Sequence, residues 1–135
     1  MKTGFVQSSI MGQSKPWLAT VLPVLNEEAH VEACLHSLLH QSLPANEHII
    51  IVMDGGSTDA TKDIVHSMMN DLNQDKHPTL LCYDNPGRFV PHARNFALQN
   101  LPESITHLLE FNGHIEADVE HLMKLKTIWA RLEAN

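Results

Sequence analysis

The chain has 135 residues, of which 43% are hydrophobic, and this length fits one domain with one hydrophobic core. Sixteen Asp and Glu against nine Lys and Arg give a formal net charge of −7, and no basic stripe follows the sequence, which argues against a nucleic-acid partner. No apolar run approaches the ~20 residues that cross a bilayer, and the N-terminus lacks a signal-peptide core, so we expect a cytoplasmic protein without a transmembrane segment.

The N-terminal part predicts a polar tail, a strand and a helix. Residues 1–16 show no sustained period, so we expect a flexible tail and a domain at residues 17–135. Residues 18–24 are strand-like, and Pro23 near their end suits a strand that leaves the sheet. Residues 26–41 carry the apolar stripe of an amphipathic helix, which Asn26 can cap.

The next segment predicts a buried strand that delivers an acidic residue to a glycine turn. Residues 49–53 are apolar without alternation, as in a strand buried on both faces of a parallel sheet, and Asp54 follows them. Two glycines then allow a tight turn, and Ser57 or Thr58 can cap a helix over residues 58–72. Asp59 falls in the first turn of that helix, where the dipole favours a carboxylate.

The second half of the chain repeats the alternation of strands and helices. Residues 79–83 and 107–111 predict two further strands, and residues 90–100 have helical spacing between them. A last amphipathic helix is expected at about residues 118–132. It should begin near Asp118 as a cap, and it should bury an apolar face that includes Val119, Leu122, Met123, Leu125, Ile128 and Trp129.

The predicted order βαβαβαβα defines an α/β fold, a three-layer sandwich with a mostly parallel sheet covered by helices on both faces. Because crossovers between parallel strands are right-handed, all four strands end at one edge. Polar residues gather there: Asn26, Glu27, Asp54, Asp59, Asp84, Arg88, Arg94, Asn95, Asn112 and His114. The carboxylates can bind a ribose hydroxyl, a base N–H or a divalent cation, and an arginine can meet a phosphate. The alternative for Asp54 and Asp59 is a purely structural role at the strand end and the helix cap.

Two other residue pairs could in principle bind a metal or form a disulfide. His36 and His40 have the spacing of a helical metal pair, but no third ligand is indicated, so we expect a solvated face. Cys34 and Cys82 lie among apolar neighbours and belong to no CxxC pair. We expect both cysteines to be buried and reduced.

Two segments at this spacing resemble the nucleotide-binding half of the family 2 glycosyltransferases, which have the GT-A fold. These segments are Val-Leu-Pro-Val-Leu-Asn-Glu-Glu at residues 21–28 and Asp-Gly-Gly-Ser-Thr-Asp at residues 54–59, followed by Ala-Arg-Asn at residues 93–95. The resemblance covers residues 17–129. It implies an inverting glycosyltransferase that uses a nucleotide-diphosphate sugar, usually a UDP sugar, in polysaccharide or glycolipid synthesis.

The resemblance also assigns nucleotide-binding residues by their positions in the motifs: Pro23, Asn26, Glu27, Asp54 and Arg94. Asp54 would accept the N–H of the uracil ring, and Arg94 would face the nucleotide. A fixed carboxylate that accepts a base N–H suits uracil and disfavours a base with only acceptors there.

The metal-binding motif departs from the family pattern. Family members usually carry Asp-x-Asp or Asp-x-His after the fourth strand, where the side chains bind the Mn²⁺ or Mg²⁺ that bridges the diphosphate. This chain has Asn112-Gly113-His114. A neutral amide is a weaker ligand for a hard cation than a carboxylate. We therefore expect metal binding to be weakened or lost, with His114 as a remaining ligand.

The family's catalytic domains also continue well beyond this strand, into the acceptor pocket and the general base. No residue of this chain matches that base, so the catalytic residues stay unknown. Two functions remain open: a glycosyltransferase acting on a saccharide or lipid-linked acceptor, or a truncated, non-catalytic nucleotide-binding module or half of a split enzyme. We expect self-association or a partner chain to complete the domain, and a location in the cytoplasm or at the inner face of the membrane.

Overall fold

The computed structural model describes residues 15–73, 75–85, 95–96 and 98–134. The elements are β1 (Leu18–Val24), α1 (Val31–Leu39), the 3-10 helix η1 (Ala45–Glu47), β2 (His48–Asp54), α2 (Thr61–Asp71), β3 (Thr79–Asp84), β4 (His107–Glu110) and α4 (His121–Ala134). Residues 95–96 and 98–100 are also helical and precede β4. The α/β class predicted from the sequence is confirmed, whereas the expected tail falls almost wholly outside the described residues.

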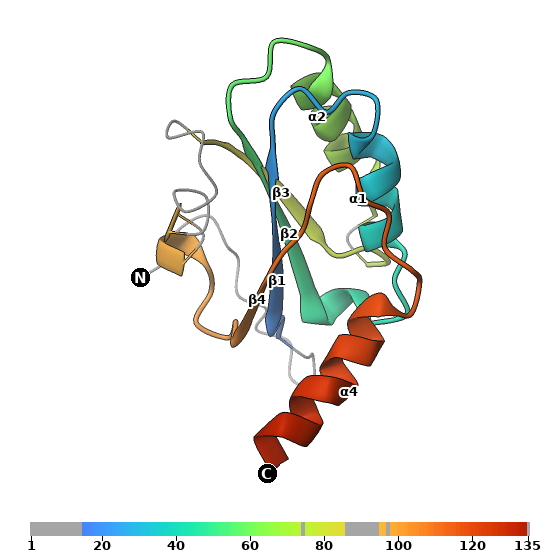
Figure 1. Ribbon diagram of the computed structural model, residues 1–135, viewed down its shortest axis with the longest axis vertical. Coiled ribbons are helices and arrows are strands. Elements are labelled where there is room, and N and C mark those ends of the chain that lie inside the picture. The colour runs from blue at the N-terminus through green and yellow to red at the C-terminus, as the bar shows by residue number, and fades with distance from the viewer. Residues whose placement is uncertain (1–14, 74, 86–94, 97, 135) are drawn as a thin grey trace.

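The four strands form one parallel sheet in the order β3-β2-β1-β4. In register, Asp54 of β2 lies opposite Val24 of β1 on one side and Asp84 of β3 on the other. Glu110, the last residue of β4, lies opposite Val21. The carboxyl ends of the strands therefore share one edge, as predicted, and the loops that follow β1, β2 and β4 lie together there (Figure 1).

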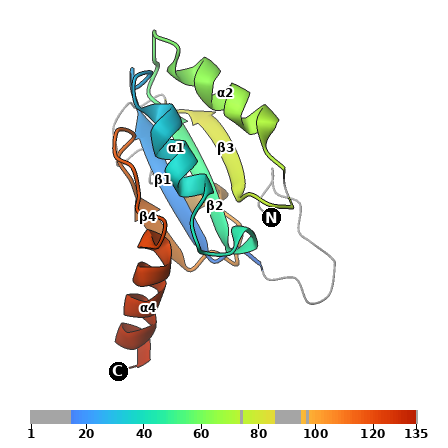
Figure 2. The same ribbon diagram turned by 90° about the vertical axis from the view of Figure 1, so that its right-hand side faces the viewer.

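Helices α1 and α2 cover one face of the sheet (Figure 2). Their core includes Leu35 and Leu38 of α1 packed with Ile50 and Val52 of β2. On the opposite face, a second cluster joins β1 and β2 to Leu101 and Phe96 from the segment that precedes β4. Every residue of β2 is buried, because both faces of this central strand are covered.

Helix α4 packs near the amino ends of the strands and then extends away from the body (Figure 1). Leu122, in its first turn, is fully buried against Leu18 and Leu43. Two residues expected in this interface are exposed instead, Val119 by 53% and Ile128 by 49%. The helix begins at His121, so Val119 lies before it, and Ile128 lies outside the cluster through which α4 contacts the body. In the described part of the chain, no helix has the length and apolar character needed to span a membrane.

Candidate functional site

The loops after β1 and β2 are joined by the side chain of Asn26. Its Oδ1 accepts the backbone N–H of Thr58 at 2.8 Å and that of Asp59 at 3.3 Å. The backbone N–H of Asn26 donates to Ser57 Oγ at 2.9 Å. Asn26 has a φ of 52°, a left-handed conformation that asparagine tolerates better than most residues. The prediction that Asn26 caps α1 is wrong, because a turn at residues 28–30 separates it from the helix, which begins at Val31.

Glu27 and Glu28 extend this connection between the loops. The N–H of Glu27 donates to Thr61 Oγ1 at 2.8 Å, and the N–H of Glu28 donates to Asp59 Oδ2 at 3.2 Å. In return, the N–H of Ala60 donates to Glu28 Oε2 at 3.0 Å. The two loops thus satisfy each other's backbone groups at the start of α2, where backbone N–H groups have no partner within the helix.

The N-cap of α2 is Ala60, so the predictions that Ser57 or Thr58 caps this helix and that Asp59 lies in its first turn are wrong. The helix begins at Thr61, later than the sequence predicts, and Asp59 Oδ1 accepts the N–H of Thr61 at 2.9 Å. Slight burial of the Asp59 carboxyl raises its pKa, but the hydrogen bonds from Thr61 and Glu28 outweigh this effect and hold the pKa below its usual value. Asp59 therefore supports the start of α2 from the position before the N-cap, without being the cap itself.

Asp54 stands at the end of β2 with its side chain turned into the glycine turn, and it is 2% exposed. Its Oδ2 accepts the N–H groups of Gly56 at 3.2 Å and Ser57 at 3.1 Å, while Oδ1 accepts the Ser57 hydroxyl at 2.5 Å. The carboxylate therefore holds the turn. Asp54 also lines a pocket of about 380 Å³ with Gly55, Gly56, Ser57, Lys62, Asp84 and Asn85.

Lys62 is a charged residue of this pocket that the sequence interpretation missed. Its Nζ forms an ion pair with Asp84 Oδ1 at 2.5 Å, and this interaction raises the pKa of the lysine. A lysine in the first turn of a helix opposes the helix dipole, so its presence there suggests a nearby carboxylate. In the sequence, the only signal for this ion pair was a lysine near the start of a predicted helix together with Asp84 at the end of a predicted strand.

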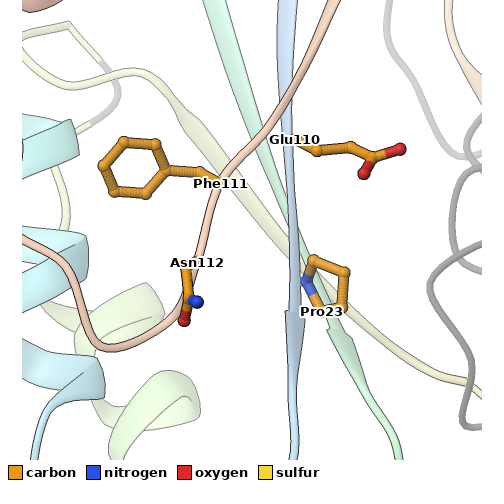
Figure 3. Close-up of a pocket in the computed structure, with 4 residues that line it drawn as sticks. All are labelled: Pro23, Glu110, Phe111 and Asn112. Carbon is orange, nitrogen blue, oxygen red and sulfur yellow. The ribbon is translucent and has the colours of Figure 1, made fainter.

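A second pocket of about 340 Å³ lies at the ends of β1 and β4, lined by Pro23, Glu110, Phe111 and Asn112. Figure 3 shows the side chains of Glu110 and Phe111 pointing to opposite sides of the chain. Pro23 and Asn112, which sequence reasoning placed at one edge, are thus brought together by the parallel pairing of β1 with β4.

The turn Asn112-Gly113-His114 packs closely against the β1 loop. Asn112 Oδ1 accepts the N–H of His114 at 3.3 Å, and His114 Nδ1 lies 3.6 Å from Glu27 Oε1. A Cβ added to Gly113 would lie 2.9 Å from Val24 Cγ1, closer than side chains normally approach. A glycine is therefore needed for this turn to reach Glu27.

The donor atoms at this turn do not fit a divalent metal well. Mg²⁺ and Mn²⁺ prefer carboxylate oxygens, whereas Asn112 offers a neutral amide whose oxygen already accepts the His114 N–H. Glu27 and His114 are close, but across residues 15–73, 75–85, 95–96 and 98–134 no three His, Cys, Asp or Glu side chains are grouped so as to hold a metal ion. The expected weakening of metal binding stays a prediction.

The remaining predictions concern residues away from these pockets or outside the described chain. Arg88 and Arg94 lie outside the described residues, so the prediction for Arg94 stays a prediction. His36 and His40 are exposed and stack on each other, with ring centroids 4.1 Å apart. Both cysteines are free thiols, as predicted, but only Cys34 is buried; Cys82, which was also expected to be buried, is partly buried.

Comparisons with known proteins agree on one family. Residues 20–123 match the model of glycosyl transferase family 2. The succinoglycan biosynthesis protein ExoA of Rhizobium meliloti is 34% identical over 94 residues, which cover 70% of this chain and 27% of ExoA. Poly(ribitol-phosphate) beta-N-acetylglucosaminyltransferase TarS of Staphylococcus aureus is 27% identical over 100 residues, 74% of this chain and 17% of TarS.

The crystal structure of TarS residues 1–349 superimposes with a TM-score of 0.67 at 25% identity, covering 85% of this chain and 32% of that one. Crystals of the same TarS fragment contain UDP or UDP-GlcNAc. This chain therefore spans about a quarter of the length of ExoA and a third of the TarS fragment.

Proposed function

Because the chain belongs to glycosyl transferase family 2, we propose that its carboxyl edge binds the nucleotide of a nucleotide-diphosphate sugar, specifically a UDP sugar. The observation that carries this proposal is the pair of pockets at the carboxyl ends of the parallel strands, where ligands of open α/β sheets bind. UDP bound to the related TarS fragment supports the same ligand class.

Each nucleotide-binding residue has a proposed role. Asp54 accepts the N–H of the uracil ring from its position in the β2–β3 pocket. Pro23 borders the β1–β4 pocket, where the sugar diphosphate lies. Asn26 acts indirectly, because its side chain holds the β2–α2 loop in place. Glu27, which lies 3.6 Å from His114, is assigned to the nucleotide by its motif. Arg94 is assigned to the nucleotide by its motif alone.

Metal ions contribute little to donor binding in this proposal. Asn112 and His114 stand where the family carries metal ligands, and their donor atoms suit Mn²⁺ or Mg²⁺ poorly. We expect Mn²⁺ to change the affinity for UDP by less than about threefold, a smaller effect than a complete carboxylate site would give.

The reaction we propose is inverting transfer of the sugar to a saccharide or lipid-linked acceptor in polysaccharide or glycolipid synthesis. Such a transfer needs a base at the acceptor hydroxyl, and no described residue is assigned to that role. The expected cytoplasmic location and the expected self-association stay predictions. Sedimentation of the purified chain measures the association, and a strictly monomeric chain would contradict it.

Calorimetric titration with UDP, with and without Mn²⁺, tests donor binding. We expect Asp54→Asn to weaken UDP binding at least about tenfold, since a hydrogen bond to a charged group contributes roughly 1.5–3 kcal/mol. Asp63→Asn makes the same charge change on an exposed position of α2 and should leave the affinity unchanged. Thermal melting of each variant shows whether the turn held by Asp54 survives. The proposal fails if the wild-type chain does not bind UDP.

A non-catalytic nucleotide-binding module, or one half of a split enzyme, is the second candidate. The observation in its favour is Asn112, which replaces a charged metal ligand with a neutral one. Incubation of the chain with UDP sugars separates the two candidates. Release of UDP by hydrolysis or transfer supports the enzyme, whereas tight binding without turnover supports the module.

A further inference from the structure

The pocket at the ends of β2 and β3 offers both acceptors and a donor to a heterocyclic base. Its lining carries two carboxylates, Asp54 and Asp84, against the single ammonium of Lys62. Carboxylate oxygens accept the N–H of a neutral heterocycle, and the ammonium donates to one of its carbonyl oxygens. The donor and acceptor groups of this pocket therefore match those of a nucleotide base.

Asp54 has limited capacity for a ligand. A carboxylate has about four acceptor positions. Of these, Oδ2 accepts the N–H groups of Gly56 and Ser57, and Oδ1 accepts the Ser57 hydroxyl. One acceptor position, on Oδ1, therefore remains for a single N–H of a ligand. Uracil presents a single N–H between two carbonyl oxygens, whereas guanine presents an N–H and an amino group side by side and needs two acceptor positions.

Lys62 supplies a donor beside this acceptor. Its ion pair with Asp84 occupies one of the three N–H groups of the ammonium, which leaves two for a ligand. Lys62 and Asp54 line the same pocket, and the charge of Asp54 adds to that of Asp84 in raising the pKa of Lys62. Lys62 therefore stays charged at neutral pH next to the carboxylate proposed to accept the base N–H.

The order of the strands decides which edge of the base meets Lys62. Asp54, on β2, lies between Asp84 on β3 and the second pocket at β1 and β4. A ribose and diphosphate that run from the base toward that second pocket leave the far edge of the ring facing β3. In uracil, the carbonyl O4 lies on that far edge, and cytosine carries an amino group there.

On the basis of the proposed function, we infer that Lys62, anchored by Asp84, donates a hydrogen bond to O4 of uracil and selects uracil over cytosine. Cytosine would place an amino N–H against the ammonium and a ring lone pair against Asp54. A site built to satisfy one pattern of donors and acceptors rejects the reversed pattern, because its own polar groups are then left unpaired.

Titration calorimetry with UDP and CDP tests the inference on wild type, Lys62→Met, Asp84→Asn and Lys76→Met. Lys76 is an exposed lysine of the loop before β3, so its variant matches the change in net charge. Because the Lys62 side chain is 43% exposed, we expect its substitution to leave the melting temperature nearly unchanged. Asp84→Asn removes the charged partner that positions Lys62 but keeps the ammonium itself, so it tests the same hydrogen bond by a different change.

We expect wild type to bind UDP at least tenfold more tightly than CDP. Lys62→Met should weaken UDP binding about tenfold and CDP binding less than threefold, Asp84→Asn should weaken UDP binding by a smaller factor, and Lys76→Met should alter neither. If Lys62→Met binds UDP like wild type, or loses UDP and CDP binding equally, the inference is overturned while the proposed function stands. If wild type binds neither nucleotide, both are overturned.

Discussion

His48, the first residue of β2, should make the chain unstable in mild acid. Its side chain is 2% exposed, and its Nε2 lies 2.7 Å from Thr20 Oγ1. Among the described residues, its Nδ1 has no hydrogen-bond partner. Burial therefore penalises the charged imidazolium and lowers the pKa of His48 from 6.5 to about 4.

The direction of the effect follows from proton uptake. As the pH falls below 6.5, the unfolded chain binds a proton at His48, whereas the folded chain does so only near pH 4. The contribution of neutral His48 is thus present in full above pH 6.5 and is lost progressively down to about pH 4. Each unit of pKa shift corresponds to about 1.36 kcal/mol, so the free energy of unfolding should fall by about 3 kcal/mol over this range. This is a large part of the stability of a small domain.

Urea unfolding measured from pH 7.5 down to pH 4 checks this prediction on wild type and His48→Gln. Glutamine does not titrate, so the variant should be less stable at pH 7.5 but should lose about 3 kcal/mol less than wild type on acidification. His66→Gln, at an exposed position of α2, serves as the control and should keep the acid sensitivity of wild type. Equal pH dependence in wild type and His48→Gln would refute the reasoning.

Three other substitutions or reactions test features of the fold. Asn26→Ala should lower the free energy of unfolding by about 2 kcal/mol and Asn26→Gly by about 1 kcal/mol. Both variants lose the side-chain hydrogen bonds of Asn26, but only alanine is strained at a φ of 52°. Equal losses in urea unfolding would contradict this. Gly113→Ala should destabilise by roughly 1–3 kcal/mol through contact with Val24, and in a double-mutant cycle Val24→Ala should relieve part of that loss. Burial raises the pKa of Cys34 and Cys82 to about 11, so both should react with iodoacetamide at pH 8 roughly a hundredfold more slowly than in urea; equal rates would show that the thiols are not protected.

The order and class of the elements could be predicted from the sequence because the signals are local. The apolar run before Asp54 and the stripe of α1 are typical of a buried strand and an amphipathic helix, and the structure has both. The helix starts were less accurate. Asn26 has the side chain of a helix cap, but its partners, Thr58 and Asp59, belong to another loop, and such long-range pairing leaves no local pattern in the sequence.

In the candidate site, too, features set by local sequence could be predicted, whereas contacts between distant residues could not. The parallel arrangement predicted that Pro23 and Asn112 would lie at one edge, because parallel strands all end on the same side of the sheet. The sequence did not show that β1 and β4 are neighbours, which is what brings the two residues into one pocket. Lys62 was missed because its place in the pocket depends on its ion pair with Asp84, and the pairing of β2 with β3 brings Asp84 near it. Ile128 was misplaced for a related reason: helical periodicity identifies an apolar stripe, whereas the contacts of α4 with the body decide which part of it is covered.

The hydrogen bonds between the β1–α1 and β2–α2 loops also constrain how this fold can be recombined. Each loop satisfies backbone groups of the other through side chains that lie about thirty residues apart in the sequence. A chimaera with a crossover point between Glu28 and Ser57 would pair loops selected in different parents. The two segments should therefore be exchanged between relatives as one unit, and libraries that shuffle them independently should yield mostly unstable chains.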